Sequence, residues 1–197
     1  MQILRDRISK DGKYLGNGIL KVDAFMNHQI DPALMKAVGE EFGKRFANVK
    51  ATRILTAETS GIAPSLAAGM VLQVPIVFAR KHQPITMAPG AYRETAESHT
   101  HKKDVELIVS AEYMNANDRI LIIDDFLASA RTILALVKLV QASGATLVGV
   151  GAVIEKGFEG GRALLKPLNV PVESLAEIER FEDDRIIFAG ETSTHAR

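Results

Sequence analysis

The sequence predicts an α/β protein built on a parallel sheet core flanked by helices. Two observations favour this class. From Arg53 to Ile154, short apolar segments with the length of buried strands alternate with segments whose apolar residues recur at helical spacing. The chain has 197 residues, of which 47% are hydrophobic, so one domain can bury a core without disulfides or metal ions. Such alternation is typical of parallel strands with helices packed on their faces.

Helices are indicated by start and stop signals as well as by spacing. Asp31 followed by Pro32 is a typical helix start, because aspartate caps free N–H groups and proline suits the first turn. Ser143-Gly144 is a typical stop. The helices that we expect comprise residues 1–10, 32–47, 62–72 and 133–141.

Strands and one long polar segment complete the prediction. Core strands are expected at residues 53–57, 74–79, 120–123 and 147–154, and an antiparallel pair in the tail at 172–182 and 186–189. Residues 82–117 are rich in Pro, Thr and charged side chains, and contain two segments, 91–100 and 104–110, that can pair as a hairpin. A polar segment of this length is either a functional lid or a disordered loop, and we expect the lid.

Composition excludes several classes of protein. Lys plus Arg and Asp plus Glu each number 24, and this zero net charge argues against a general binder of nucleic acids or acidic membranes. The absence of Cys excludes a disulfide scaffold, a thiolate metal site and a cysteine nucleophile. The first ten residues lack the apolar core of a signal peptide, and Pro75 interrupts the apolar stretch 62–79. We therefore expect a cytoplasmic protein without a membrane span.

The strongest chemical signal is the segment from Ile120 to Ile133. Four aliphatic residues are followed by Asp124 and Asp125, and then by a loop of small and hydroxyl residues before the next helix. Ligands of parallel sheets bind at the carboxyl ends of the strands. Two adjacent buried carboxylates need a partner, such as the hydroxyls of a ribose with a magnesium ion nearby, and the loop presents N–H groups to an anion. The pattern favours a phosphate-and-ribose site over a simple cap of the turn.

Here the sequence resembles a known family. Residues 120–132 are similar to the phosphoribosyl-diphosphate signature of type I phosphoribosyltransferases. The resemblance extends to the xanthine-using bacterial branch of that family through four further segments, namely Leu20–Pro32, Glu58–Pro64, Val77–His82 and Ile154–Phe158. It implies transfer of a phosphoribosyl group from 5-phosphoribosyl 1-diphosphate (PRPP) to xanthine in purine salvage, with magnesium and as a homodimer.

The resemblance also implies a division of the chain. It indicates a single phosphoribosyltransferase domain over residues 1–197, with a core at about 32–156 that includes the lid at 82–117. The segments 1–31 and 157–197 would form a small hood over the core.

Roles of single residues follow from the same resemblance. Asp124 and Asp125 would bind the ribose hydroxyls, and Lys81 would stabilise charge on the departing pyrophosphate. Magnesium would be held by substrate and water, with no direct protein ligand. The PRPP site would comprise Ser60, Gly61, Arg80, Ala128, Ser129, Ala130, Arg131 and Thr132, and the xanthine site Leu20, Asn27 and Lys156. A lysine donor suits a purine carbonyl and would meet the amino group of adenine badly.

The chain departs from the family pattern in the phosphate loop. Ser129-Ala130 stands where many relatives have Thr-Gly, so alanine fits there if its φ is negative. Ala128 stands where other purine enzymes carry an aspartate proposed as general base, so this loop contains no candidate for the general base. Ser98 and Tyr92 are candidates for a lid hydroxyl over the pyrophosphate.

Two alternatives stay open. The first is that the base is guanine or hypoxanthine, which offer the same carbonyl to Lys156. A purine regulator that senses PRPP without catalysis is a further alternative, although the roughly thirty residues before the first core helix are too few for a helix-turn-helix module.

Overall fold

The computed structural model describes residues 1–96, 105–182 and 185–191. Its centre is a six-stranded sheet with the order β10-β9-β8-β7-β3-β4. In chain order these strands are β3 (Arg53–Ala57), β4 (Ile76–Ala79), β7 (Arg119–Leu127), β8 (Thr146–Lys156), β9 (Val172–Glu182) and β10 (Arg185–Phe188). The pairs from β4 through to β9 are parallel, and β10 is antiparallel to β9. The predicted parallel sheet is therefore confirmed.

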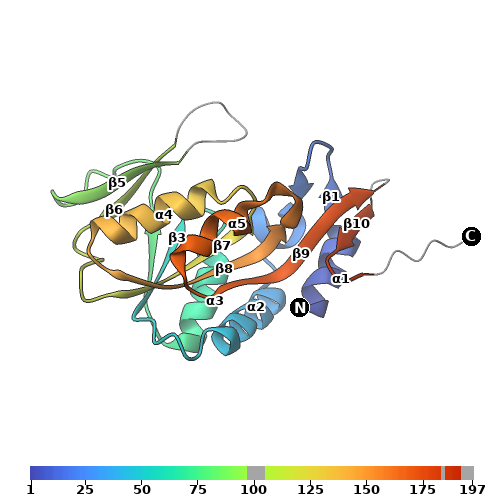
Figure 1. The fold of residues 1–197 in the computed structure, drawn as a ribbon, viewed down its shortest axis with the longest axis horizontal. Helices are drawn as coiled ribbons and strands as arrows, with labels where there is room; N and C mark the ends of the chain where they lie inside the picture. The colour runs from blue at the N-terminus through green and yellow to red at the C-terminus, as the bar shows by residue number, and fades with distance from the viewer. Residues whose placement is uncertain (97–104, 183–184, 192–197) are drawn as a thin grey trace, which may run out of the picture.

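Two apolar layers cover the sheet, because successive residues of a strand point to opposite faces. Along β7, Leu121 and Ile123 join the cluster beneath α2 (Pro32–Arg45) and α3 (Ile62–Leu72). Ile120 and Ile122 join the opposite cluster, beneath α4 (Arg131–Ala142). Figure 1 shows α2 and α3 on one side of the sheet and α4 on the other.

The helix signals in the sequence act as predicted. The side chain of Asp31 accepts hydrogen bonds from the backbone N–H groups of Ala33 and Leu34, at 2.9 and 3.1 Å, at the start of α2. Ser143 ends α4, and Gly144 follows with φ +74°. The apolar stretch 62–79 is divided between α3 and β4, and none of the described helices is long and apolar enough to cross a membrane.

Strand β7 is longer than predicted. We expected it to end at Ile123, but it continues to Leu127 because β8 still pairs with it beyond that point. Asp124 and Asp125 therefore belong to the strand itself. Correspondingly, α4 begins at Arg131, two residues before the predicted start.

The lid segment contains the predicted hairpin. Strands β5 (Ala91–Ala96) and β6 (Val105–Ser110) are antiparallel, and the residues between them, 97–104, lie outside the described residues. Ala96, Leu107 and Val109 are buried in the cluster with α4, so the described strands of the hairpin are packed on the core along most of their length. A backbone bridge from Ile108 to Arg80 ties it to the end of β4.

The N-terminal segment and the tail lie together. The N-terminal segment contains α1 (Gln2–Asp11), the two-residue strands β1 (Lys13–Tyr14) and β2 (Leu20–Lys21), and a π-helical turn η1 (Asp23–Asn27). Between β8 and β9 lie η2 (Gly157–Glu159), α5 (Gly161–Leu165) and η3 (Lys166–Leu168). Tyr14 stacks on Phe181 of β9 with ring centroids 4.1 Å apart. The tail strands, which we expected in the hood, extend the central sheet and meet the N-terminal segment there (Figure 1).

Candidate functional site

A cavity of about 970 Å³ lies where β3, β7 and β8 end. This is the edge at which parallel sheets bind ligands. Its lining comes from five stretches of the chain, namely residues 17–20, 57–61, 124–133, 156–159 and the lid strands, with Lys81 in addition. Of the predicted site residues, Leu20, Ser60, Gly61, Lys81, Asp124, Asp125, Ala128, Ser129, Ala130, Arg131, Thr132 and Lys156 all line it.

The acidic pair lies on the cavity wall. Asp124 is 5% exposed, and Asp125 is partly exposed with its backbone N–H donating to Asp124 Oδ1 at 3.1 Å. Burial and the neighbouring Asp125 carboxylate raise the pKa of Asp124 well above its usual value, while the Lys81 ammonium opposes that rise. Burial also raises the pKa of Asp125. A ligand that brings hydroxyl donors or positive charge to this pair would favour its ionised form.

The loop after β7 leads directly into α4, as predicted. Residues 128–132 line the cavity at the N-terminal end of a twelve-residue helix, where unpaired N–H groups attract an anion. The condition that we set for Ala130 is not met, because its φ is +62°, in the left-handed region that favours glycine. Ala130 takes this conformation because it is the residue that turns the strand exit into the first turn of the helix.

The turn after β3 forms the adjoining wall. Glu58, Thr59, Ser60 and Gly61 line the cavity, and the Glu58–Thr59 peptide bond is cis. A Cβ at Gly61 would lie 2.0 Å from Thr56 Oγ1 and 2.6 Å from Asp124 Oδ1, while the φ of Gly61 is an ordinary −72°. Glycine at position 61 therefore serves close approach and not an unusual dihedral angle, and it lets the turn lie against the acidic pair.

The two adjacent basic residues Arg80 and Lys81 lie in different surroundings. Lys81 lines the cavity, and its backbone N–H donates to Glu58 Oε1 at 2.6 Å. Arg80 does not line it. The backbone of Arg80 bridges to Ile108 of the lid, and its guanidinium lies 5.6 Å from the ring centroid of Phe78. Adjacent residues of an extended segment point in opposite directions, which explains why one of the two cations is turned away from the cavity.

The part of the wall predicted to bind the base is largely aromatic. Lys156 is 15% exposed at its side chain, with its ammonium 3.4 Å from Glu159 Oε1 and 5.4 Å from the ring centroid of Phe126. Phe158 and Leu20 line the cavity beside it. This combination places a lysine, paired with Glu159, beside the apolar side chains of Leu20, Phe126 and Phe158, a setting that suits a flat ring carrying a carbonyl oxygen.

Asn27 links this region to the acidic pair. It is not among the lining residues, but its side-chain amide donates to Asp125 Oδ2 at 3.3 Å from the end of η1. The structure therefore places Asn27 beside the cavity as a partner of an aspartate.

Among the lining residues that sequence reasoning missed are three that surround Lys156 or follow it, namely Phe126, Phe158 and Glu159. Phe126 follows the aspartates along the same strand, and the resemblance motif included Phe158 without giving it a role. Of the two lid candidates, Tyr92 packs on the core cluster beneath α4, and Ser98 lies outside the described residues. In the described parts of the chain, no three His, Asp or Glu side chains gather in a way that would hold a metal ion.

Comparison with known proteins agrees with this geometry. The model of the phosphoribosyl transferase domain family matches residues 27–184. Xanthine phosphoribosyltransferase of Lacticaseibacillus casei is 49% identical over 97% of this chain and 100% of its own length. The enzymes of that name from Latilactobacillus sakei and Listeria monocytogenes are 47% and 46% identical, again over nearly the full length of both chains.

Solved structures agree in fold. Adenine phosphoribosyltransferase of Rhodothermus marinus superposes with a TM-score of 0.72 at 22% identity, covering 90% of this chain and 97% of its own. The Giardia lamblia enzyme of the same name gives 0.74 at 19% identity, covering 90% and 98%. The match of the domain model and the near-full-length relatives together show that this chain belongs to the phosphoribosyltransferase family, in the branch that contains the curated xanthine phosphoribosyltransferases.

Proposed function

We propose that this protein transfers the phosphoribosyl group of PRPP to xanthine, giving xanthosine 5′-monophosphate and pyrophosphate in purine salvage. The observation that carries the proposal is one cavity that joins a buried acidic pair and an anion-binding loop to a lysine among aromatic side chains. Relatives named for the xanthine reaction, 46–49% identical over nearly their whole length, support this choice of base.

The residues would divide the work as follows. The loop 128–132 binds the 5′-phosphate at the N-terminal end of α4, and Asp124 and Asp125 accept hydrogen bonds from the ribose hydroxyls. Ser60, Gly61 and Lys81 surround the pyrophosphate, where the ammonium opposes the charge that develops as the bond to the ribose breaks. Lys156 donates to a carbonyl of the base. Arg80 faces away from the cavity, so we assign it no contact with PRPP.

The site fits a magnesium ion carried by the substrate. The carboxylates of Asp124 and Asp125 give this part of the wall a negative charge that would attract a divalent cation bound to PRPP. With PRPP bound, magnesium would supply positive charge to the diphosphate oxygens. We propose that substrate and water supply its ligands, in a cytoplasmic homodimer whose lid (residues 82–117) excludes water from the activated sugar.

A competition assay tests the proposal. The protein is mixed with PRPP, magnesium and equal amounts of xanthine, guanine, hypoxanthine and adenine, and the nucleotides formed are separated and quantified. We expect xanthosine monophosphate to dominate and adenosine monophosphate to be absent. If the nucleotide of guanine or hypoxanthine dominates, that base is the substrate and xanthine is not. If the protein binds PRPP but forms no nucleotide, it is a regulator.

A further inference from the structure

Glu155 is a buried carboxylate that the proposed reaction does not use. It is 2% exposed near the end of β8 and does not line the cavity, although the next residue, Lys156, does. An ionised carboxylate at such a position is costly unless its oxygens are paired. A residue of this kind beside a proposed ligand of the base therefore requires an explanation.

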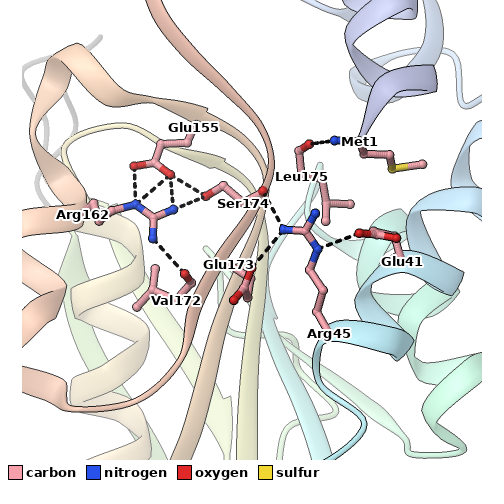
Figure 2. A network of polar contacts seen from close by, with 9 residues as sticks. All are labelled: Met1, Glu41, Arg45, Glu155, Arg162, Val172, Glu173, Ser174 and Leu175. Carbon is pink, nitrogen blue, oxygen red and sulfur yellow. Dashed lines mark hydrogen bonds and ion pairs between the residues drawn. The ribbon is translucent and has the colours of Figure 1, made fainter. Parts of the chain in front are cut away.

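Arg162 of α5 supplies the pairing. Its Nε donates to Glu155 Oε1 and Oε2 at 2.8 and 3.1 Å, and its Nη2 also contacts Oε2. Ser174 of β9 donates its hydroxyl to the same Oε2 at 2.6 Å, and Arg162 Nη1 donates to the carbonyl of Val172 at 2.8 Å. Figure 2 shows this guanidinium held between Glu155 and β9. Such complete pairing is what makes a buried ion pair tolerable.

The ion pair between Glu155 and Arg162 joins the two ends of the short segment 156–161. One end of this segment lies at the part of the cavity predicted to bind the base, and the other end contacts the loop 128–132. Lys156 follows Glu155 at one end, and Gly161 precedes Arg162 at the other. The N–H of Gly161 donates to the carbonyl of Ala128 at 3.0 Å. A Cβ on Gly161 would lie 2.1 Å from that oxygen and 2.7 Å from the N of Ala130, so the segment presses directly on the phosphate loop.

We propose that Glu155 and Arg162 are a positioning pair that holds the base wall (Lys156 and Phe158) in register with the phosphate loop (residues 128–132). The inference rests on the proposed function. By fixing both ends of the segment 156–161, the pair sets the distance between the group that binds the base and the loop that binds the phosphate. Transfer requires both substrates at a reactive separation, so a small shift of this segment lowers the rate without removing any substrate contact.

A second arginine provides the control. Arg45 of α2 lies across β9 from Arg162, where it pairs with Glu41 and Glu173 at 2.8 and 3.0 Å and donates to the carbonyl of Ser174 at 3.1 Å (Figure 2). Neither Arg45 nor its partners line the cavity. Arg45→Gln therefore removes a guanidinium that contacts the same strand, β9, without changing a contact of the segment 156–161.

The experiment compares Arg162→Gln, Arg162→Lys and Arg45→Gln by steady-state kinetics, each below its own melting temperature. We expect Arg162→Gln to lower kcat/KM for xanthine and PRPP by about 10- to 100-fold. Arg162→Lys should recover part of the loss, because it restores the charge without the planar fork. Arg45→Gln should lower the melting temperature and leave kcat and KM near their wild-type values. Equal kinetics for Arg162→Gln and Arg45→Gln would overturn the positioning role.

Hydrogen exchange gives a readout that does not depend on the reaction. Amides of residues 128–133 should exchange faster in Arg162→Gln than in Arg45→Gln, and unchanged exchange would overturn the inference. If the two variants differ in exchange in this way but the wild-type protein shows no transfer, the proposed function fails and the structural coupling stands. If Arg162→Gln does not fold, Ser174→Ala decides, since it removes one hydrogen bond from Glu155: faster exchange of 128–133 supports the coupling, and unchanged exchange contradicts it.

Discussion

The cavity has two walls that are built in different ways. The acidic wall, comprising Asp124, Asp125 and the loop 128–132, comes from one continuous stretch of β7 and the start of α4. The aromatic wall comprises Leu20, Phe126, Lys156, Phe158 and Glu159, and comes from three separate segments of the chain. The first depends on local geometry at a strand end, whereas the second depends on how distant segments pack.

The two walls also differ in the state of their charges. Burial raises the pKa of both aspartates, because the fold alone offers their ionised forms too few compensating partners. On the aromatic wall, Lys156 already has Glu159 and the face of Phe126 as partners. The acidic wall thus gains most from a bound ligand, and the aromatic wall is largely preorganised. Substitutions in the two walls should accordingly have opposite effects on the ligand-free protein.

Asp124→Asn should have the largest effect. The amide cannot accept charge-assisted hydrogen bonds as the carboxylate does, so we expect transfer to fall by about 100-fold or more. Relative to wild type, the same change should raise the melting temperature of the ligand-free protein at pH values where Asp124 ionises, because it removes the cost of a buried carboxylate. Retention of wild-type kcat/KM would exclude the ribose role of Asp124.

The pH dependence of this gain follows from the raised pKa of Asp124. Between its ordinary value of 3.8 and its higher value in the folded state, the folded protein binds more protons than the unfolded chain, so stability falls as pH rises through that window. Above the window the cost is fully present, and below 3.8 it disappears. Thermal unfolding of both proteins should show a larger advantage for Asp124→Asn at pH 8 than at pH 4. A constant difference would contradict this account.

Lys156→Gln should have the next largest effect, confined to the base. Loss of a charged hydrogen bond is worth about 1.5–3 kcal/mol, which corresponds to a fall in kcat/KM for xanthine of about 10- to 100-fold. The KM for PRPP should stay unchanged, because Lys156 lies in the aromatic wall. Lys138→Gln, an exposed lysine of α4 that pairs with Glu94, is the matched control. An equal rise in KM for both substrates would mean that the two walls do not act separately.

Asn27→Ala tests the contact between the walls. The Asn27 amide donates to Asp125 at 3.3 Å in a partly open setting, so we expect a loss of about 1 kcal/mol, or roughly fivefold in kcat/KM. The loss should appear with PRPP as the varied substrate as well as with xanthine, because Asp125 belongs to the acidic wall. If the loss affects xanthine alone, Asn27 contacts the base directly and the link to Asp125 is incidental.

The same difference between local geometry and long-range packing explains which parts of the structure could be predicted from the sequence. The parallel sheet, the bounds of β3 and α3, and the loop 128–132 follow from signals within a few residues of one another. Arg80 and Lys81 are adjacent and chemically alike, so no local pattern shows that Arg80 turns toward Phe78 and away from the cavity. The pairing of Glu155 with Arg162 and Ser174 depends on β8 lying beside β9, which no local signal reports.

The length of β7 illustrates the same limit. The apolar run ends at Ile123, so its pattern predicts the end of the strand there. Pairing with β8 up to Leu127 carries the two aspartates within the strand, because the partner strand supplies the hydrogen bonds that the polar residues would otherwise seek in a turn. Tertiary pairing overrides local composition at the position where the chemistry lies.

Ala130→Gly should have the smallest effect, and it tests the geometry of the acidic wall without changing its charge. Ala130 has φ +62°, which costs an L-residue about 1–2 kcal/mol, whereas glycine loses about 0.5–1 kcal/mol in backbone entropy. We expect a net gain of roughly 0.5 kcal/mol, or about 1–2 °C in melting temperature. Ala128→Gly is the matched control: Ala128 is in the same loop but without a positive φ, so glycine there should lower the melting temperature. If both substitutions destabilise the protein equally, the methyl of Ala130 contributes more by packing than its backbone conformation costs.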